Sequence, residues 1–334
     1  MVRIAVIGTG AFGVEHIRTI RSMNGVELFG ICNRSEERLM IVAKEYGISS
    51  EKTYTDVTKL LQEKALDAVV IATDEQSHEP IARQAVEYGK HVLIEKPIST
   101  QVETAEQLLK LAKTSDSIIL PGHMLRFDPG YAAVKNKLET ITGPIHSVRF
   151  KRNVPFERFS LHARTHPVFM ALSHDIDQLV WYTNSKPKRF FAMEKKIVSD
   201  IDMPGIFFGF IEMEDGMICS LETQWCLPNE YGQYLDVELE MMYDGGHIRY
   251  RFPGDTLSVM DHGKMMRPDI QLSPFIHGHV YGALRNELEH FVELIKNKST
   301  RQVVPMEEAV LGIKICDALI TSAKERRAIS WENV

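Results

Sequence analysis

Three glycines near the start of the chain have the spacing of a phosphate-binding loop. They follow the apolar run Val2–Ile7 directly, and a helical pattern continues from them through Met23. The first permits a tight turn, the second lets backbone approach a pyrophosphate, and the third allows helix to pack closely on strand. Free N–H groups in the first helical turn attract an anion. In this context a glycine turn without a ligand is the weaker alternative. The predicted dinucleotide site is formed by Gly8, Thr9, Gly10, Ala11, Phe12 and Gly13.

The segment Asn33-Arg34-Ser35 stands where the second strand ends. An acidic residue at this place accepts the ribose 2′-hydroxyl of NAD. Asn33 has no charge to repel a phosphate, and Arg34 and Ser35 can bind a 2′-phosphate. The segment therefore favours NADP. NAD stays open, because an asparagine also bonds a free hydroxyl and Arg34 can simply be solvated.

Lys96 lies in Glu95-Lys96-Pro97, directly after the apolar run that starts at His91. Ligands of open α/β sheets bind at the carboxyl ends of the strands. An ammonium group there can hydrogen-bond a substrate hydroxyl and stabilise negative charge on its oxygen. The alternative is a solvated lysine paired with Glu95.

The first third of the chain alternates short apolar runs with helical periods. The expected strands are Val2–Ile7, Glu27–Cys32, Ala68–Ile71, His91–Ile94 and Ile118–Leu120. Apolar strands that alternate with helices indicate a parallel sheet covered on both faces. We therefore expect an α/β Rossmann domain over residues 1–123. Asp56 is expected to cap a short helix, and the helix from His78 is expected to end at Tyr88-Gly89.

Beyond residue 124 the apolar residues alternate with polar ones. A two-residue turn at Asp244-Gly245 would place Glu240 opposite Arg249, Glu238 opposite Arg251 and Met241 opposite Ile248, so charge and apolar face agree on one hairpin. Asp215-Gly216 separates a second pair of apolar runs, and helical patterns at Ala283–Lys296 and Met306–Lys324 close the chain. We expect residues 124–334 to form an α+β domain with a largely antiparallel open sheet.

Composition excludes several classes of protein. The 334 residues have a net charge of −6, so neither nucleic acid nor an anionic membrane is an expected partner. No apolar run approaches the length of a membrane span, and the start has no signal-peptide pattern. The four cysteines are far apart, which is typical of the reducing cytoplasm and argues against a disulfide scaffold. No metal is expected, because the histidines lack a carboxylate or cysteine at ligand spacing.

Taken together, these motifs resemble one family. The glycines, Ile71-Ala72-Thr73 with His78, and Gly89–Val92 running into Glu95-Lys96-Pro97 look like the glucose–fructose oxidoreductase/inositol dehydrogenase/rhizopine-catabolism (Gfo/Idh/MocA) family. Gly122-His123, Arg126-Phe127 and residues 286–291 extend the resemblance along the chain. It implies NAD(P)-dependent redox chemistry on sugars, inositols or nucleotide sugars. It also implies that Ala72, Thr73, His78, Glu95 and Lys96 lie at the cofactor, and that the second sheet forms a homodimer or homotetramer.

The resemblance also implies a second catalytic segment on the helix predicted over Val168–Trp181. His174 would be the general base, and Asp177 would lie beside it in contact with substrate. At 100° per residue, Met170, His174, Asp177 and Trp181 form one stripe and Leu172, Ile176 and Leu179 another. One departure stands out: the usual first aspartate aligns with Met170, which accepts no proton. Without the resemblance, a packed histidine bonded to Asp177 would be the preferred interpretation.

A run of basic residues precedes this helix. Five cations lie between residues 149 and 164, and in sequence only Glu157 opposes them. A solvated strand edge explains such a run more often, but its place suggests an anionic group on the substrate, met by Arg152 and Arg164. Arg126 and Trp225 are further substrate candidates, as is His123.

The predicted reaction is hydride transfer between a secondary carbinol carbon and nicotinamide, with Lys96 on the oxygen and His174 taking the proton. Two rival functions stay open. One is a sensor that binds the dinucleotide without turnover, which Met170 motivates. The other is an elimination or epimerisation that uses the cofactor transiently and shows no net change in nicotinamide absorbance.

Overall fold

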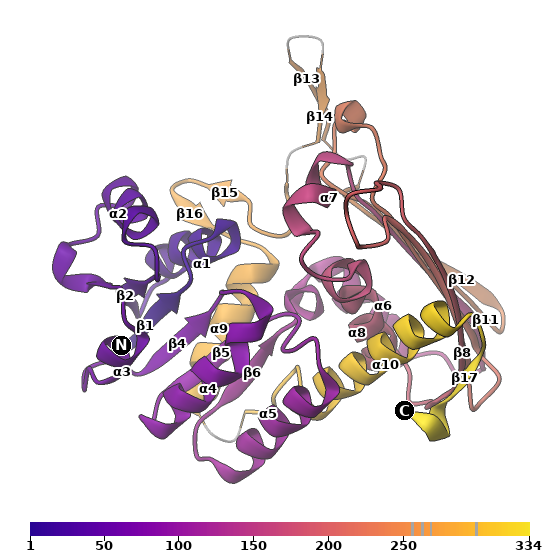
Figure 1. The fold of residues 1–334 in the computed structure, drawn as a ribbon, viewed down its shortest axis with the longest axis horizontal. Helices are drawn as coiled ribbons and strands as arrows, with labels where there is room; N and C mark the ends of the chain where they lie inside the picture. Colours follow the sequence, from indigo (N-terminus) through magenta and orange to yellow (C-terminus); the bar gives the residue numbers. More distant parts are fainter. Residues whose placement is uncertain (255–256, 262–263, 268, 298–299) are drawn as a thin grey trace. The chain divides into compact units, whose positions relative to one another are not determined.

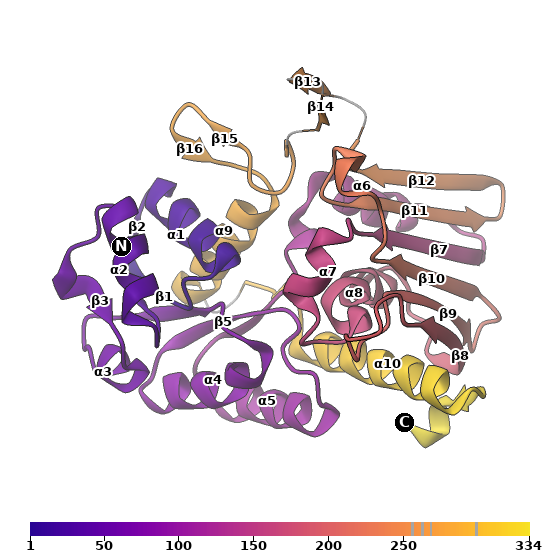
Figure 2. The same ribbon diagram turned by 45° about the horizontal axis from the view of Figure 1, so that its top comes forward.

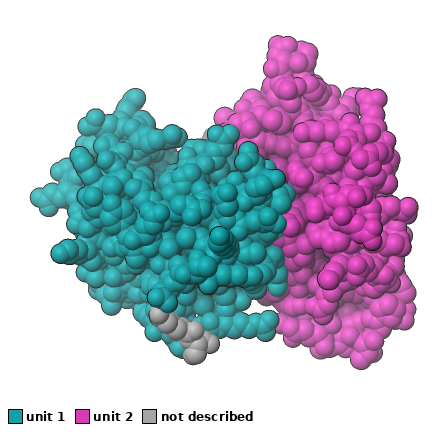
Figure 3. Space-filling view, turned by 60° about the horizontal axis from the view of Figure 1, so that its bottom comes forward, with its two compact units in different colours: residues 1–129, 270–310 teal, residues 130–269, 311–334 magenta. Residues whose placement is uncertain are grey.

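The computed structural model describes residues 1–334 except 255–256, 262–263, 268 and 298–299. The chain divides into two compact units (Figure 3). Unit 1 comprises residues 1–129 and 270–310, and unit 2 comprises residues 130–269 and 311–334. The predicted division at residue 123 differs from these units in two respects, because residues 124–129 and residues 270–310 belong to unit 1. None of the described helices is long and apolar enough to cross a membrane.

Unit 1 is built on a six-stranded parallel sheet in the order β3-β2-β1-β4-β5-β6 (Figure 1). The strands are β1 (Val2–Ile7), β2 (Val26–Cys32), β3 (Thr53–Tyr54), β4 (Ala68–Ile71), β5 (His91–Glu95) and β6 (Ile119–Gly122). The five predicted strands are confirmed to within two residues. The two-residue β3 was not predicted, because so short an edge strand has no periodicity of its own.

The helices of unit 1 begin and end at recognisable residues. They are α1 (Ala11–Ser22), α2 (Glu36–Glu45), α3 (Val57–Leu61), α4 (His78–Glu87) and α5 (Val102–Thr114). Asp56 caps α3 by accepting a hydrogen bond from the Thr58 N–H at 2.7 Å, and Gly89 ends α4 with a φ of 70°. Both helix ends were predicted.

Residues 270–310 complete the core of unit 1. The hairpin β15 (Phe275–Ile276) and β16 (His279–Val280) leads into α9 (Ala283–Lys296). Leu288 and Phe291 on α9 are fully buried in one cluster with Ile17 and Ile20 of α1. Figure 1 shows α9 and the hairpin beside α1. The apolar stripe of α9 therefore finds its partner nearly 270 residues back along the chain.

Unit 2 is built on a seven-stranded sheet in the order β12-β11-β7-β10-β9-β8-β17 (Figure 2). Its strands are β7 (Ile145–Asn153), β8 (Pro187–Lys195), β9 (Ile206–Met213), β10 (Ile218–Gln224), β11 (Asp236–Tyr243), β12 (Gly246–Phe252) and β17 (Ile329–Ser330). Only the β7–β10 pair is parallel. The predicted hairpin has the expected register: Glu238 pairs with Arg251, Glu240 with Arg249 and Met241 with Ile248.

Helices cover one face of this sheet (Figures 1 and 2). They are α6 (Pro129–Leu138), α7 (Glu157–His162), α8 (Ser173–Tyr182) and the unit 2 part of α10 (Met306–Glu325). The small hairpin β13 (Val259–Asp261) and β14 (Lys264–Met266) projects from the loop after β12. A π-helical turn at Val168–Leu172 runs directly into α8. Leu172, Ile176 and Leu179 are buried, as the predicted core stripe requires.

Candidate active site

The glycine loop of unit 1 has no room for side chains at two of its three glycines. Gly8 has a φ of 100°, and a Cβ there would lie 2.3 Å from the Ala72 carbonyl oxygen. A Cβ on Gly13 would lie 2.0 Å from the Gly8 carbonyl oxygen. These two glycines let β1, β4 and α1 approach each other closely, which confirms the structural reason for their spacing.

Gly10 has a different environment, since a Cβ there would meet nothing within 4 Å. It caps α1 without a side-chain hydrogen bond, and the first turn of the helix has no acidic residue. The loop therefore presents free N–H groups to open space at the positive end of a helix dipole. A dinucleotide pyrophosphate fits this cradle.

Side chains after β2 are organised around Thr9. The Asn33 amide donates to the Thr9 hydroxyl at 2.6 Å, and the Ser35 hydroxyl caps α2. Arg34 is exposed and pairs with Asp74 at 3.0 Å. Arg38, which sequence reasoning missed, donates from Nε to the Thr9 carbonyl at 2.9 Å. Arg38 could have been predicted from its place in the first turn of the helix after β2, because helix N-termini attract phosphates.

His78 lies against the loop that holds Lys96. Its Nδ1 is 3.0 Å from the Pro97 carbonyl oxygen, and its Nε2 is 3.4 Å from that of Thr73. Burial lowers the pKa of His78, although both carbonyls and nearby carboxylates oppose this. The imidazole therefore lies between the residues that follow β4 and the turn after β5.

Lys96 follows the last residue of β5 and is partly exposed. Its backbone N–H donates to Glu95 Oε2 at 3.2 Å. Glu95 is buried, and its Oε1 lies 2.7 Å from Nε2 of His16. These two Glu95 contacts go to an imidazole and a backbone N–H. The role of the Lys96 side chain stays a prediction. His16 was not among the predicted site residues.

In unit 2, the basic stretch is neutralised by neighbouring acids. Strand β7 lies inside the sheet between β10 and β11, so it is not the solvated edge that was considered. Lys151 pairs with Asp236 at 2.9 Å, and Arg149 lies 3.6 Å from Glu240. The expectation that only Glu157 opposes these cations is wrong, because strand pairing brings the acids of β11 beside them.

Arg152 and Asp175 form a fully buried ion pair. Two guanidinium nitrogens donate to the two carboxylate oxygens at 2.7 and 2.8 Å. Although burial opposes the charge, Asp175 raises the pKa of Arg152. The pair ties α8 to β7, so these Arg152 contacts are internal. Its predicted contact with substrate stays a prediction.

The α8 residues divide between surface and interior. His174 is partly exposed, whereas Asp177 is buried and accepts a hydrogen bond from the Gln178 amide at 3.4 Å. Met170, on the π-helical turn, packs with Trp225 in an apolar cluster that includes Phe159 and Val154. The position of the family aspartate is therefore apolar here. The roles predicted for His174, Asp177 and Trp225 stay predictions.

The two remaining predicted arginines differ in environment. In unit 1, Arg126 is buried, donates to the Val303 carbonyl at 3.1 Å and pairs with Glu308. It thereby joins the segment after β6 to residues 303–308. In unit 2, Arg164 is exposed. Their contact with substrate stays a prediction, and the exposed Arg164 is the more accessible of the two.

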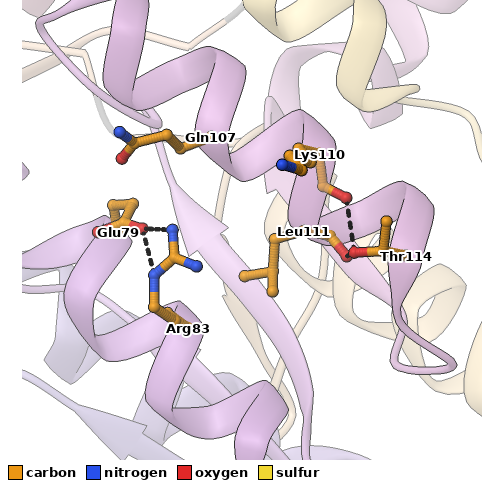
Figure 4. Close-up of a pocket in the computed structure, with 6 residues that line it drawn as sticks. All are labelled: Glu79, Arg83, Gln107, Lys110, Leu111 and Thr114. Atoms are coloured by element: carbon orange, nitrogen blue, oxygen red, sulfur yellow. Dashed lines mark hydrogen bonds and ion pairs between the residues drawn. The ribbon is translucent and has the colours of Figure 1, made fainter.

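The described residues of each unit line a hollow. One of about 340 Å³ lies between α4 and α5 and contains the Glu79–Arg83 ion pair (Figure 4). The other, of about 310 Å³, lies in unit 2 beside Lys151 and Asp236. None of the residues that line either hollow is a predicted site residue. The strand ends of unit 1 and the α8 face of unit 2 stay the predicted places of the chemistry.

The fold and the glycine cradle define a Rossmann oxidoreductase, and comparison with known proteins places it in a family. Residues 2–123 match the model of the oxidoreductase family with an NAD-binding Rossmann fold, and residues 143–249 match the GFO/IDH/MocA C-terminal domain. The chain belongs to the Gfo/Idh/MocA family of oxidoreductases, as its motifs indicated.

Several relatives are similar over most of the chain. A scyllo-inositol 2-dehydrogenase (NAD⁺) of Bacillus subtilis is 28% identical, with 92% of this chain and 90% of that protein covered. A 4-carboxy-2-hydroxymuconate-6-semialdehyde dehydrogenase of Sphingobium is 28% identical over 73% of each chain. The crystal structure of scyllo-inositol dehydrogenase from Lactobacillus casei has a TM-score of 0.84 at 20% identity and covers 99% of both chains. The last likeness concerns the fold.

Proposed function

We propose that this dehydrogenase oxidises a secondary hydroxyl group of a cyclic polyol or sugar, or reduces the corresponding ketone. The observation that supports this most directly is the open Gly10 cradle at the start of α1, with Lys96 at the end of β5 in the same unit. Inositol dehydrogenases among the relatives support the class of substrate. A bound nicotinamide supplies the hydride acceptor or donor.

The chain's own residues hold the substrate oxygen and move its proton. The Lys96 ammonium donates a hydrogen bond to that oxygen and stabilises negative charge on it. The His174 imidazole takes the hydroxyl proton, a task suited to a group whose ordinary pKa lies near neutrality. Asp177 lies one turn beyond His174 on α8 and contacts the substrate. Met170 packs in an apolar cluster and takes no part in proton transfer.

The test is an absorbance assay at the nicotinamide band with a panel of inositols, sugars and sugar acids. We expect turnover of at least one polyol, lost by about 100-fold or more in Lys96→Ala and in His174→Ala. Cofactor that binds to the wild type without any turnover across the panel would instead support the sensor alternative. Tightly retained cofactor with product but no net absorbance change would support elimination or epimerisation.

We propose NADP as the preferred cofactor. Asn33 has no charge, Arg34 is exposed, and Arg38 lies beside Thr9, which supports a site for a 2′-phosphate near the end of β2. Asp74 competes for Arg34. Arg34→Ala is expected to reduce the affinity for NADPH by about tenfold and to leave that for NADH within about twofold. Equal affinity of the wild type for both would contradict this proposal.

We propose Arg164 as the residue that meets an anionic group, if the substrate has one. Arg164 is exposed, whereas Arg152 is buried in its ion pair with Asp175. One relative is named for a carboxylated substrate. Arg164→Ala is expected to raise KM for sugar acids more than for inositols. An equal change for both classes would remove the proposal of an anionic substrate.

We propose that the uncovered face of the unit 2 sheet forms a homodimer or homotetramer. Phe191 and Phe210 pair across β8 and β9 on that face and are 41% and 48% exposed. Met193 and Ile218, on the same face, are 60% and 55% exposed. Exposed apolar clusters of this kind mark interaction surfaces. Light scattering is expected to give a smaller mass for Phe210→Glu than for the wild type.

We further infer that the protein acts in the reducing cytoplasm. Its four cysteines, Cys32, Cys219, Cys226 and Cys316, are all free thiols. Free thiols persist where the compartment keeps them reduced. A thiol titration of freshly purified protein under denaturing conditions is expected to find four.

A further inference from the structure

His16 is a buried polar residue on an apolar helix stripe. Gly13, His16, Ile17 and Ile20 are the buried side of α1, and His16 is fully buried. Its Nδ1 contacts no hydrogen-bond partner among the described residues, whereas its Nε2 lies 2.7 Å from Glu95 Oε1. We take the Glu95 carboxylate as the acceptor and the Nε2–H of His16 as the donor. Buried polar side chains are normally hydrogen-bonded, so the contact with Glu95 accounts for an imidazole at this buried position.

Glu95 is held in one orientation by three neighbours. His16 donates to Oε1, and the Lys96 backbone N–H donates to Oε2 at 3.2 Å. A Cβ at Gly122 on the neighbouring strand would lie 3.3 Å from Oε1, so glycine leaves the space that the carboxylate needs. Both oxygens of the carboxylate are therefore used inside unit 1. The carboxylate links a helix to the backbone of the residue that we propose as catalytic.

His16 also touches the glycine loop. Its ring meets the ring of Phe12 edge to face, with centroids 5.3 Å apart. Phe12 is one of the six residues of the predicted dinucleotide cradle. The imidazole thus contacts the loop on one side and Glu95 on the other, and both contacts lie within one compact unit.

We propose that His16 is a positioning residue, which through Glu95 fixes the backbone of Lys96 and so the place where its ammonium meets the substrate oxygen. This inference rests on the function proposed above. A small displacement of a catalytic group costs much of its effect, because the hydrogen bond must be formed at the reacting oxygen. His16 itself touches neither substrate nor reacting atoms.

The direct measurement is the backbone amide resonance of Lys96 in protein labelled with ¹⁵N-lysine. Its peak is assigned as the one that Lys96→Arg removes. In His16→Ala we expect this amide proton to move upfield by more than any other lysine amide, because Glu95 Oε2 is released from its position. His16→Gln, whose amide can donate to Glu95, is expected to restore most of the shift. Thr19→Ala, a buried change on the same helix that does not touch Glu95, is the matched control and is expected to leave the peak in place.

Kinetics supply the second readout. We expect kcat of His16→Ala to fall by about 10- to 100-fold, with KM and dinucleotide affinity changed by no more than about twofold. His16→Gln recovers kcat, and Thr19→Ala keeps that of the wild type. Where His16→Ala does not fold, Glu95→Gln, which keeps the shape but weakens both hydrogen bonds, is expected to move the same amide.

The outcomes separate this inference from the proposed function. A wild type without turnover overturns the proposed function, while the amide measurement still tests the linkage. An unmoved Lys96 amide in both His16→Ala and Glu95→Gln overturns the linkage. If the Lys96 amide resonance shifts in His16→Ala while kcat is unchanged in an active enzyme, the contact through Glu95 does not affect the reaction. That result overturns the positioning role of His16.

Discussion

Single residues in unit 1 show how one motif serves two purposes. Gly8 and Gly13 are required by close backbone approach, but Gly10 has open space at its Cα. Its φ of −68° is one that alanine adopts readily. The conformational need for glycine at position 10 is therefore small, and our proposed reason for it is the space that a bound pyrophosphate requires.

Gly10→Ala is consequently expected to separate folding from binding. Its cost to the free energy of unfolding should be at most about 1 kcal/mol, the value of a changed helix cap. Dinucleotide affinity should fall by about tenfold or more, because the new methyl group occupies the cradle. Urea denaturation and a fluorescence titration check the two parts. Unchanged affinity would contradict the placement of the pyrophosphate.

His78 should make stability depend on pH. Burial lowers its pKa below the ordinary value of 6.5 in the folded state. The unfolded chain then binds the proton more readily, so this contribution is present above pH 6.5 and is lost as the pH falls below it. Thermal unfolding between pH 7.5 and 5 should show a shallower decline of Tm for His78→Gln than for wild type. Parallel curves would show that His78 is not the group responsible.

At the scale of elements, a buried ion pair connects α8 to β7. Asp175 lies between the buried Ile176 and the proposed base His174, and its carboxylate receives two hydrogen bonds from Arg152. A buried ion pair adds little to the free energy of unfolding compared with apolar residues of the same shape. Removing one partner is costly, because it leaves an uncompensated buried charge. The pair is thus a specific link between this helix and this strand.

Asp175→Ala should therefore lower the free energy of unfolding by about 3–5 kcal/mol, because it leaves the buried Arg152 guanidinium without its carboxylate. The double variant Arg152→Met/Asp175→Leu should recover most of this loss, since neither charge is then buried. Urea denaturation of the wild type, the single variant and the double variant measures both. A double variant no more stable than Asp175→Ala would show that shape, and not charge, decides the packing.

At the scale of the whole molecule, the chain leaves unit 1 at Pro129 and returns to it at Ile270. Unit 1 depends on that return, because Phe291 of α9 is fully buried among residues of the Rossmann core. Unit 2 has its own core, in which Phe190 of β8 is fully buried. The two cores can therefore be destabilised separately.

Hydrogen exchange read by mass spectrometry should show this separation. Phe291→Ala is expected to lower the free energy of unfolding of unit 1 by about 3–5 kcal/mol. It should also speed amide hydrogen exchange in β1, β4 and β5. Phe190→Ala, matched in residue type and burial, is expected to speed exchange in β8 and β9 instead. Equal acceleration throughout the chain in both variants would show a single cooperative unit.

Much of this protein follows from local patterns. The glycine loop after β1, the Asp56 cap and the β11–β12 register were all predictable, because turn chemistry and periodicity act over a few residues. The family also follows from motifs of this kind. In the candidate site, Lys96 and Asn33 were proposed from their places at strand ends, and they follow β5 and β2 directly.

Only the tertiary structure decided which distant groups meet. A buried histidine at position 16 needs a partner, but helical periodicity does not indicate that Glu95, 79 residues away, supplies it. The same holds for Arg152 with Asp175, and for α9 in the core of unit 1. The acids of β11 likewise pair with Arg149 and Lys151, in a basic run that in sequence only Glu157 opposes. Local periodicity specifies which face of an element is buried, and the packing of the whole unit selects what that face contacts.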